Sequence, residues 1–380
     1  MKLSERASDL PASGIRRFFE LAEARDDVIS LGVGEPDFSA PWAARVAAID
    51  SLERGRTSYT ANRGMAALRE RIADHHERYD QSYAPDEEII VTTGASEAVD
   101  LAFRALVNPG DTVAVHEPTY ISYAPGIELA GGEPLSVPTR AADDFALTRD
   151  RLVAAGAAEA DVLVLCYPNN PTGATMSDEE LAAVAAFCRD HDLRVIADEI
   201  YAALTYRGDH ASIATQPGMR ERTVVVNGFS KAYAMTGLRL GYALGPADAI
   251  GAMNRIHQYT MLSAPTTPQY AAMEALDRCD DEVTEMVEEY NRRRRLVVSR
   301  FNEMGLDTFE PTGAFYAFPD CGGDDERFAE ELLEATGVAV VPGSVFGAGG
   351  EGHLRVSYAT SMRELKEATD RIAEFVADRS

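Results

Sequence analysis

The sequence predicts an α/β protein in which a mostly parallel sheet flanked by helices is followed by a smaller α+β domain. From about residue 85, short β-rich runs alternate with helical patterns, which indicates a parallel sheet covered by helices. The runs are continuously apolar, as expected for strands buried on both faces. After about residue 280 the pattern changes to long helices with a few short strands, and this change predicts the second domain.

Each element is predicted from its local pattern. Strands of the large sheet are expected where β-branched and apolar residues run together, at residues 89–92, 112–115, 162–165, 194–197 and 223–226. A helix is predicted over residues 95–107, because its apolar residues recur at helical spacing. In the second domain, residues 338–341 and 354–357 are predicted to be strands.

Composition excludes several classes of protein. The formal charge of −26 argues against nucleic acid as a partner, because phosphate binding needs a basic surface. No apolar run approaches the roughly 20 residues of a membrane helix, and residues 1–10 lack the apolar core of a signal peptide. The four cysteines are scattered, which favours reduced thiols in a cytoplasm over disulfides or a zinc site. We therefore expect a soluble cytoplasmic enzyme without a metal.

The charged residues carry two further predictions. Three lysines, many alanines and abundant Asp and Glu indicate a halophilic protein, although an ordinary acidic surface would look the same. The one basic cluster, residues 291–295, lies within an amphipathic helical pattern. A solvated helix face is predicted there rather than a nucleic-acid patch.

Polar residues follow every one of the five strands. They are Gly94 to Ser96 after the first strand, Tyr120 after the second, Asn170 after the third, Asp198 at the end of the fourth and Lys231 after the fifth. In open α/β sheets, ligands bind at the carboxyl ends of the strands. The sequence therefore predicts one ligand site to which all five strands contribute.

Lys231 lies in the most informative stretch of the chain, residues 228–241. The other two lysines, Lys2 and Lys366, lie near the two ends, and the basic charge comes almost wholly from arginine. A lysine kept among small and apolar residues indicates amine chemistry, because an arginine cannot form a Schiff base. A surface lysine is the alternative, which the apolar neighbours disfavour.

Together these residues match what a pyridoxal 5′-phosphate (PLP) enzyme needs. Lys231 would form the Schiff base with the cofactor and, once displaced by substrate, move the proton of the substrate Cα. Asp198 would hold the pyridine nitrogen protonated, although the N-cap of a helix would explain it equally well. Tyr201, three residues later, could donate to the ring oxygen or be a packed aromatic residue. Asn170, in a turn fixed by two prolines, could reach the ring oxygen and the substrate carboxylate, or belong to a structural loop.

The phosphate of such a cofactor also has candidate ligands. Gly94, Ala95 and Ser96 open a helix after a strand, where backbone amides and the helix dipole suit an anion. Arg239 could add a bidentate contact, and Ser230 is either a phosphate ligand or an ordinary turn hydroxyl. The sequence therefore predicts an anion site beside the lysine.

Two further residues complete the predicted site. Tyr120 could stack on the cofactor ring and also face the substrate. Arg355 could bind the substrate α-carboxylate as a fork, although among so many arginines it is weakly marked by itself.

These motifs resemble the class I aminotransferases of PLP fold type I over essentially the whole chain. The resemblance is carried by residues 30–38, Tyr59, residues 170–173, Asp198, Tyr201, residues 228–241, residues 313–316 and Arg355. Residues 13–16 and 341–344 resemble the archaeal aspartate/aromatic aminotransferase branch. The resemblance implies a large domain with a mostly parallel seven-stranded sheet at residues 46–280 and a small domain at residues 281–380. An N-terminal segment, residues 1–45, would line the active site and pack with the small domain.

The same resemblance implies a homodimer with active sites at the subunit interface. Tyr59 would reach the phosphate of the partner's cofactor, Gly34 would line the substrate site, and Arg355 would take the α-carboxylate. Two departures stand out. Gly228 replaces a phosphate-binding serine found in many relatives, and Tyr120 replaces the tryptophan that stacks on the cofactor in typical aspartate aminotransferases. No arginine can be assigned to a distal carboxylate.

The expected activity is transfer of an amino group from an L-amino acid, aspartate or aromatic, to a 2-oxo acid such as 2-oxoglutarate by a ping-pong mechanism. A PLP lyase or decarboxylase would use the same residues, because the fate of the carbanion depends on bond orientation over the ring. A ligand-sensing regulator with a retired aminotransferase domain is disfavoured, since the pattern starts by about residue 13 and leaves no room for a DNA-binding unit. A nicotinamide dehydrogenase is disfavoured because no Gly-x-Gly-x-x-Gly opens a strand-to-helix turn.

Overall fold

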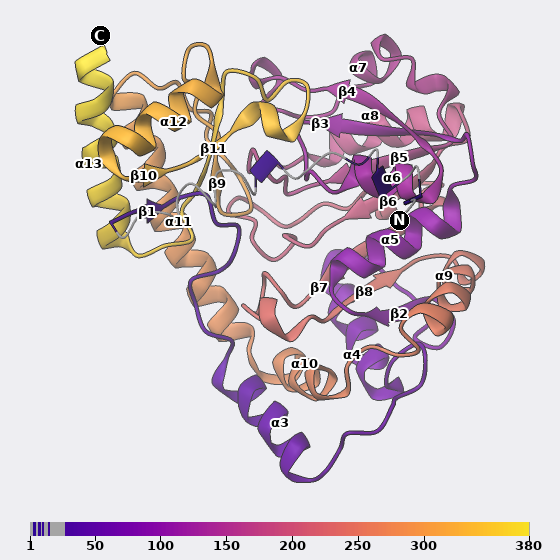
Figure 1. The fold of residues 1–380 in the computed structure, drawn as a ribbon. Helices are drawn as coiled ribbons and strands as arrows, with labels where there is room; N and C mark the ends of the chain where they lie inside the picture. Colours follow the sequence, from indigo (N-terminus) through magenta and orange to yellow (C-terminus); the bar gives the residue numbers. More distant parts are fainter. Residues whose placement is uncertain (1–2, 5–6, 9, 11–13, 16–26, 380) are drawn as a thin grey trace.

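A computed structural model describes residues 3–4, 7–8, 10, 14–15 and 27–379 of the chain (Figure 1). Its largest sheet has seven strands in the order β2-β8-β7-β6-β5-β3-β4. β8 runs antiparallel to both of its neighbours, and the other neighbouring pairs are parallel. The predicted mostly parallel sheet is therefore confirmed.

The strands of this sheet include the five predicted ones. They are β2 (Ile89–Thr92), β3 (Thr112–Glu117), β4 (Glu133–Pro138), β5 (Val162–Cys166), β6 (Arg194–Asp198), β7 (Thr223–Gly228) and β8 (Gly241–Leu244). Two of them, β4 and β8, lie outside the predicted set. β4 is an edge strand with mostly exposed or half-buried residues, so it has no continuous apolar run. β8 begins at Gly241, the last residue of the lysine motif, so it was not recognised as a separate strand.

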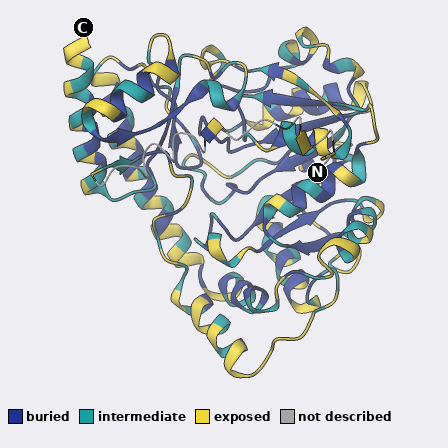
Figure 2. Cartoon of the chain, viewed as in Figure 1, coloured by how far each residue is buried: buried dark blue, intermediate teal, exposed yellow. Residues whose placement is uncertain are grey.

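Alternate residues of each strand enter different cores on the two faces of the sheet. In β5, Leu163 and Leu165 belong to one core while Val162 and Val164 belong to the other, and all four are buried. Figure 2 shows the sheet as a dark-blue layer between helices whose outer faces are exposed. This two-sided burial is the physical reason for the continuously apolar runs.

Helices cover both faces. The first core takes side chains from α3 (Trp42–Glu53), α4 (Ala66–His76), α7 (Arg149–Ala154), α8 (Asp178–Asp190) and α10 (Thr266–Arg278). The second takes them from α5 (Ala95–Leu106), α6 (Tyr123–Ala130) and α9 (Ala247–Thr260). The helix predicted over residues 95–107 is thus confirmed as α5. Short 3-10 helices lie at Glu77–Tyr79, Ala141–Asp143, Ala157–Glu159, Ile213–Thr215, Arg220–Arg222, Thr236–Leu238 and Gly343–Phe346.

The C-terminal part has small sheets packed on long helices. Its elements are α11 (Asp280–Glu303), β9 (Tyr316–Ala317), α12 (Asp325–Thr336), β10 (Val338–Ala339), β11 (Val341–Pro342), β12 (Leu354–Ser357) and α13 (Met362–Arg379). The strand predicted at residues 338–341 is wrong as a single element. β10 pairs with β1 (Ile29–Ser30), whereas β11 pairs with β12. A continuous apolar run cannot reveal that its two halves have different partners. The domain boundaries at residues 45 and 280 stay predictions.

A strap, residues 31–41, leads from β1 in the C-terminal part to α3 at the opposite end of the molecule (Figure 1). Backbone hydrogen bonds fix its start, since Leu31 N donates to Ala339 O and Ser357 N donates to Leu31 O. The strap therefore begins as part of the small sheets and then passes over the ends of the large-sheet strands.

The basic cluster on α11 differs from its prediction. Arg293 and Arg294 are buried rather than solvated. Arg293 Nη1 lies 2.8 Å and 2.9 Å from the two carboxylate oxygens of Asp37 in the strap, and Arg294 Nη1 lies 2.7 Å from Glu310 Oε1. Arg295 is exposed, as predicted. The prediction of a solvated helix face is therefore wrong for Arg293 and Arg294. Their carboxylate partners, Asp37 and Glu310, lie outside the helix, so the helical pattern could not reveal them.

Among the helices that the structure describes, none combines the length and the apolar character needed to cross a membrane.

Candidate active site

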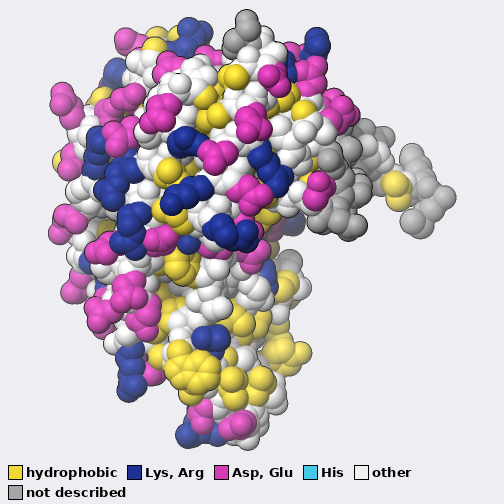
Figure 3. All heavy atoms as spheres, turned by 90° about the vertical axis from the view of Figure 1, so that its left-hand side faces the viewer, with side chains coloured by type: hydrophobic (Ala, Val, Ile, Leu, Met, Phe, Trp, Pro, Cys, Tyr) yellow, Lys and Arg dark blue, Asp and Glu magenta, His cyan; other side chains and the backbone are white. Residues whose placement is uncertain are grey.

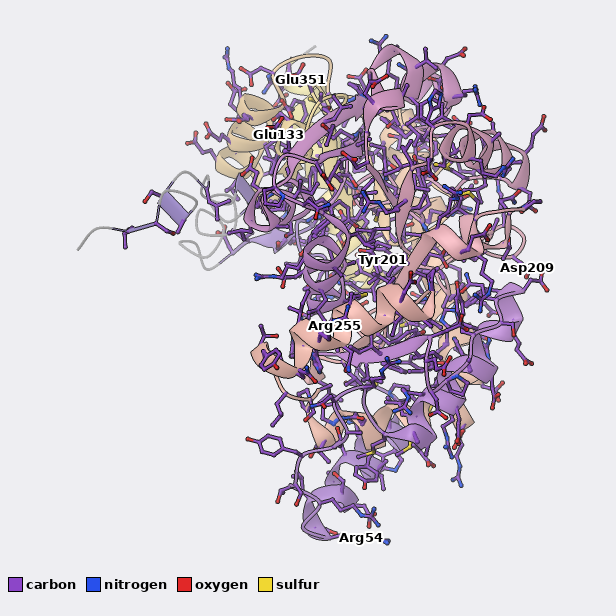
Figure 4. The ribbon with its side chains drawn as sticks, turned by 90° about the vertical axis from the view of Figure 1, so that its right-hand side faces the viewer. Arg54, Glu133, Tyr201, Asp209, Arg255 and Glu351 are labelled. Atoms are coloured by element: carbon purple, nitrogen blue, oxygen red, sulfur yellow. The ribbon has the colours of Figure 1, made fainter. Side chains whose placement is uncertain are left out.

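A cavity of about 660 Å³ lies at the carboxyl ends of the large-sheet strands. It is lined by most of the residues that the sequence singles out: Gly34, Ala95, Ser96, Tyr120, Asn170, Asp198, Tyr201, Ser230, Lys231, Arg239 and Arg355. Tyr201 lies inside the molecule, between the layers (Figure 4). Two predicted residues are not in the lining. Gly94 lies directly behind it, and Tyr59 is exposed on the surface of this subunit.

Lys231 follows β7 and reaches across the cavity to the strap. Its Nζ donates to Gly34 O at 2.6 Å and lies 5.7 Å from the ring centres of Tyr201 and Phe315. Burial lowers its pKa to about 8, and the positive charge of Arg355 acts in the same direction. A substantial fraction of the amine is therefore neutral near pH 8, as a nucleophile requires.

Asp198 ends β6 and is buried. Its Oδ2 accepts from the Tyr123 hydroxyl at 2.7 Å, and its Oδ1 accepts from Ile200 N at 3.1 Å. Burial raises the pKa of this carboxyl to about 6, while the two donors oppose that rise. A turn follows Asp198 rather than a helix, so the helix N-cap interpretation does not apply.

An anion cradle is formed where α5 begins. Gly94 has a φ of +78°, and a Cβ added to it would lie 2.7 Å from Arg239 Nη2. The guanidinium therefore lies against the helix N-terminus, where free backbone amides and the helix dipole already favour an anion. Ala95, Ser96 and the buried Ser230 line the same end of the cavity.

Gly228 is explained by close packing of β7 on β8. A Cβ there would lie 3.0 Å from Gly241 Cα and 3.1 Å from Leu240 O. A serine at this position would crowd those backbone atoms. The cradle of this chain therefore relies on the helix N-terminus and on Arg239.

Arg355 on β12 is a buried cation with an unused donor. Its Nη1 donates to Asn170 Oδ1 at 2.9 Å and its Nη2 to Gly32 O at 2.6 Å. The guanidinium carbon lies 4.8 Å from the ring centres of Tyr316 and Phe346. Among the described residues, its buried Nε has no hydrogen-bond partner. A buried donor without a partner is costly, so this guanidinium is suited to an anionic ligand.

Sequence reasoning gave no role to two tyrosines of the site. The Tyr316 hydroxyl lies 2.8 Å from the Tyr201 hydroxyl, and a Cβ on Gly34 would lie 2.6 Å from Tyr316 Oη. Tyr316 was visible only as part of a family motif. Tyr123, the partner of Asp198, lies three residues after Tyr120, and this spacing was its only signal in the sequence.

These residues fit PLP. The cavity holds a lysine amine of lowered pKa, a buried carboxylate, a helix N-terminus beside an arginine fork, and an arginine with a spare buried donor. A sheet of this topology with these groups at its carboxyl edge defines a PLP-dependent enzyme of fold type I.

Comparison with known proteins narrows the class. Residues 26–372 match the family described as aminotransferase class I and II. The chain belongs to this family of PLP-dependent transaminases. It is 51% identical to a putative aminotransferase, YugH, of Bacillus subtilis over 98% of both chains. It is 42% identical to an aspartate aminotransferase of Pyrococcus abyssi over 100% of this chain and 99% of the other.

Solved structures show the same fold. An aromatic aminotransferase from Pyrococcus horikoshii superposes with a TM-score of 0.91 at 42% identity, over 96% of this chain and 99% of the other. An aspartate aminotransferase from Thermus thermophilus with maleate superposes with a TM-score of 0.93 at 38% identity, over 98% and 99%. The predicted resemblance to the archaeal aspartate and aromatic aminotransferases is confirmed.

Proposed function

We propose that this transaminase moves the amino group of an aromatic L-amino acid or aspartate to a 2-oxo acid, 2-oxoglutarate, in a ping-pong cycle. The observation that carries the proposal is that Arg355 and Lys231 line the same cavity, and that the buried Nε of Arg355 has no hydrogen-bond partner among the described residues. An α-amino acid brings a carboxylate for the first group and a Cα proton for the second. The named relatives support the two donor classes.

When bound, PLP supplies an aldehyde that takes up the substrate amino group and a ring that accepts electrons from the substrate Cα. Arg355 would bind the α-carboxylate with its guanidinium, which Asn170 holds in place through Nη1. Lys231, released from Gly34 O, would take the proton at the substrate Cα. Asp198 would supply the negative charge that holds the ring nitrogen protonated.

The phosphate and the ring oxygen have separate binding groups. Arg239 and the N-terminus of α5 at Gly94 bind the phosphate. The hydroxyl of Tyr201, oriented by Tyr316 at 2.8 Å, donates to the ring oxygen. Tyr120 would stack on the ring.

The cavity favours aromatic donors over aspartate. The cations among its described lining residues are Lys231, Arg239 and Arg355, and each already has a role. Glu35 adds a negative charge at the same cavity, where it interacts with Thr236. A distal carboxylate would therefore meet an acid and no spare cation among the described lining residues.

The visible absorption spectrum tests the proposal. The yellow band of bound PLP should bleach when phenylalanine is added to the protein in high salt, bleach less readily with aspartate, and return with 2-oxoglutarate. A band that persists with every amino acid would contradict the donor assignment. Release of ammonia or carbon dioxide in place of exchange with an oxo acid would contradict the ping-pong cycle.

An exposed apolar surface supports a homodimer. Trp42, Val46, Ile49 and Leu52 recur at helical spacing along α3 and are all exposed. Figure 3 shows hydrophobic side chains gathered at the lower end of the face in view, which is where α3 lies in Figure 1. Contiguous apolar patches on a soluble protein mark interaction sites, and a second copy of this chain is the proposed partner.

Two exposed tyrosines could also take part in such a dimer. Tyr59 is 80% exposed and Tyr259 is 87% exposed. The loops that follow them are joined, since Asn62 Nδ2 donates to Leu262 O at 2.6 Å. Side chains this exposed have room to enter a partner subunit, and Tyr59 is proposed to reach the phosphate of the partner's PLP.

Hybrid dimers test the shared site. Lys231→Ala and Tyr59→Ala homodimers should both be nearly inactive. Mixing them should restore activity, because one site of each hybrid then combines a native Lys231 with a native Tyr59 from the other subunit. Mixtures no more active than their components, or a protein that stays monomeric in size-exclusion chromatography in high salt, would contradict the proposal.

Three broader features are proposed with this function. The chain is divided into residues 1–45, 46–280 and 281–380, with the first segment moving with the last. The enzyme works in the cytoplasm, which suits its four free cysteines. The charge of −26 is proposed to be an adaptation to salt, so activity should rise from low to molar KCl.

A further inference from the structure

Tyr123 is hydrogen-bonded to the buried carboxylate of Asp198. It is the first residue of α6 and is fully buried. Its hydroxyl donates to Asp198 Oδ2 at 2.7 Å, while the other carboxylate oxygen accepts from Ile200 N. We propose that Tyr123 is a positioning residue that keeps Asp198 ionised and directed at the pyridine nitrogen of PLP. The inference rests on the proposed role of Asp198.

The position of Tyr123 is fixed from two sides. Its ring meets the edge of Tyr120 at 5.6 Å and 83°, and it meets Phe103 at 6.5 Å and 79°. Edge-to-face contacts of this kind hold a ring in one orientation. The loop that begins α6 therefore carries both Tyr120, which is proposed to stack on the cofactor ring, and the hydroxyl that binds the carboxylate.

Asp198 needs this donor in order to carry a charge. Its burial raises its pKa, and the neighbouring carboxylate of Glu199 acts in the same direction. Hydrogen bonds to the ionised form oppose that rise, and the Tyr123 hydroxyl is one of two that the structure shows on this carboxylate. The Cys166 thiol is the second polar neighbour of the hydroxyl. Burial raises the pKa of that thiol to about 12, so it stays neutral beside the pair.

Loss of the hydroxyl should act through one atom of the cofactor. Without the Tyr123 hydroxyl, a larger fraction of Asp198 is in the neutral, protonated form. A neutral carboxyl gives a protonated ring nitrogen no counter-charge, so the variant should bind the cofactor more weakly. A cofactor analogue with C–H in place of the ring nitrogen has no such proton and should not register the change.

The test compares PLP with that deaza analogue on the apoprotein of Tyr123→Phe. Phenylalanine keeps the ring contacts, so the variant is expected to fold. The dissociation constant of PLP, measured by fluorescence titration, should rise about tenfold, or about 1.4 kcal/mol, while that of the analogue should change less than about twofold. In holoprotein carrying ¹⁵N in the cofactor ring, the nitrogen resonance should move toward the unprotonated position.

Tyr167→Phe is the matched control. Tyr167 is also buried, and its hydroxyl donates to Phe145 O at 2.9 Å, away from Asp198. This variant should leave the ratio of the two dissociation constants unchanged. Equal losses for PLP and the analogue in Tyr123→Phe, or an unchanged ratio, would overturn the inference. Wild-type protein that binds both ligands equally would instead overturn the role of Asp198.

Discussion

Replacing Arg293 by methionine should loosen the strap that carries Gly34. Arg293 holds Asp37 through two contacts of 2.8 Å and 2.9 Å and Glu289 through a third of 2.9 Å. Its guanidinium also lies 5.2 Å from the ring centre of Phe38. Methionine keeps the apolar stem of the side chain but leaves Asp37 without its ion-pair partner, whereas Glu289 keeps its pair with Arg292.

The expected loss follows from burial. Breaking one partner of a buried ion pair costs roughly 3–5 kcal/mol. The Asp37 side chain is 26% exposed, against 7% for Arg293, so water compensates part of that loss. We expect the free energy of unfolding to fall by about 2 kcal/mol. Because Gly34 O holds Lys231 and Gly32 O holds Arg355, KM for the amino acid should also rise several-fold.

Urea unfolding of the apoprotein in high salt measures the first effect, and steady-state kinetics measures the second. Arg295→Met is the matched control, because Arg295 lies in the same run on the same helix but is exposed. It should change the stability by less than about 0.5 kcal/mol. If the two variants are indistinguishable in both stability and KM, the strap is not held by Arg293 and the reasoning is refuted.

Three further predictions follow from the site and the core. Gly228→Ser should destabilise the protein by about 1–3 kcal/mol through overpacking against β8 and should not tighten PLP binding, as urea unfolding and fluorescence titration would show. Covalent capture of PLP by Lys231, trapped by borohydride, should accelerate with pH and level off above about 8, because burial lowers the pKa of the amine to about 8. Burial also lowers the pKa of His76 to about 4 from 6.5. A depressed histidine pKa contributes stability above pH 6.5 that is lost as pH falls toward 4. His76→Gln should therefore flatten the acid loss measured by urea unfolding between pH 7 and pH 4.

The sequence could predict elements whose surroundings are uniform. Strands buried on both faces, such as β5, need apolar residues at every position, so their runs are unmistakable. The edge strand β4 has no such requirement and left no comparable pattern. The strand β8 is buried throughout, but it is only four residues long and begins at the last residue of the lysine motif. The run at residues 338–341 is uniformly apolar, yet it serves two sheets, and its division depends on the partners that fold against it.

In the site, too, residues set by local pattern could be predicted, whereas residues set by distant partners could not. Residues at the ends of strands, such as Asp198 and Lys231, could be found because the topology of a parallel sheet brings those ends together. The role of Tyr123 could not be predicted in this way, because it depends on a hydrogen bond to a carboxylate 75 residues away. Arg293 was misread for a similar reason. A run of arginines looks solvated until the fold brings up a carboxylate 256 residues upstream.

The pairing of β1 with β10 also sets when an active enzyme can exist during its synthesis. Ile29 leaves the ribosome early, whereas its partner Val338 is among the last residues made. At about 5–20 residues per second, the roughly 300 residues between them take roughly 15–60 s to translate. A nascent chain can complete every strand of the large sheet in that time, and with them Lys231 and Asp198, while its strap still lacks a sheet to join. Arg355 emerges later still, so a stalled or truncated product cannot hold an amino acid in place.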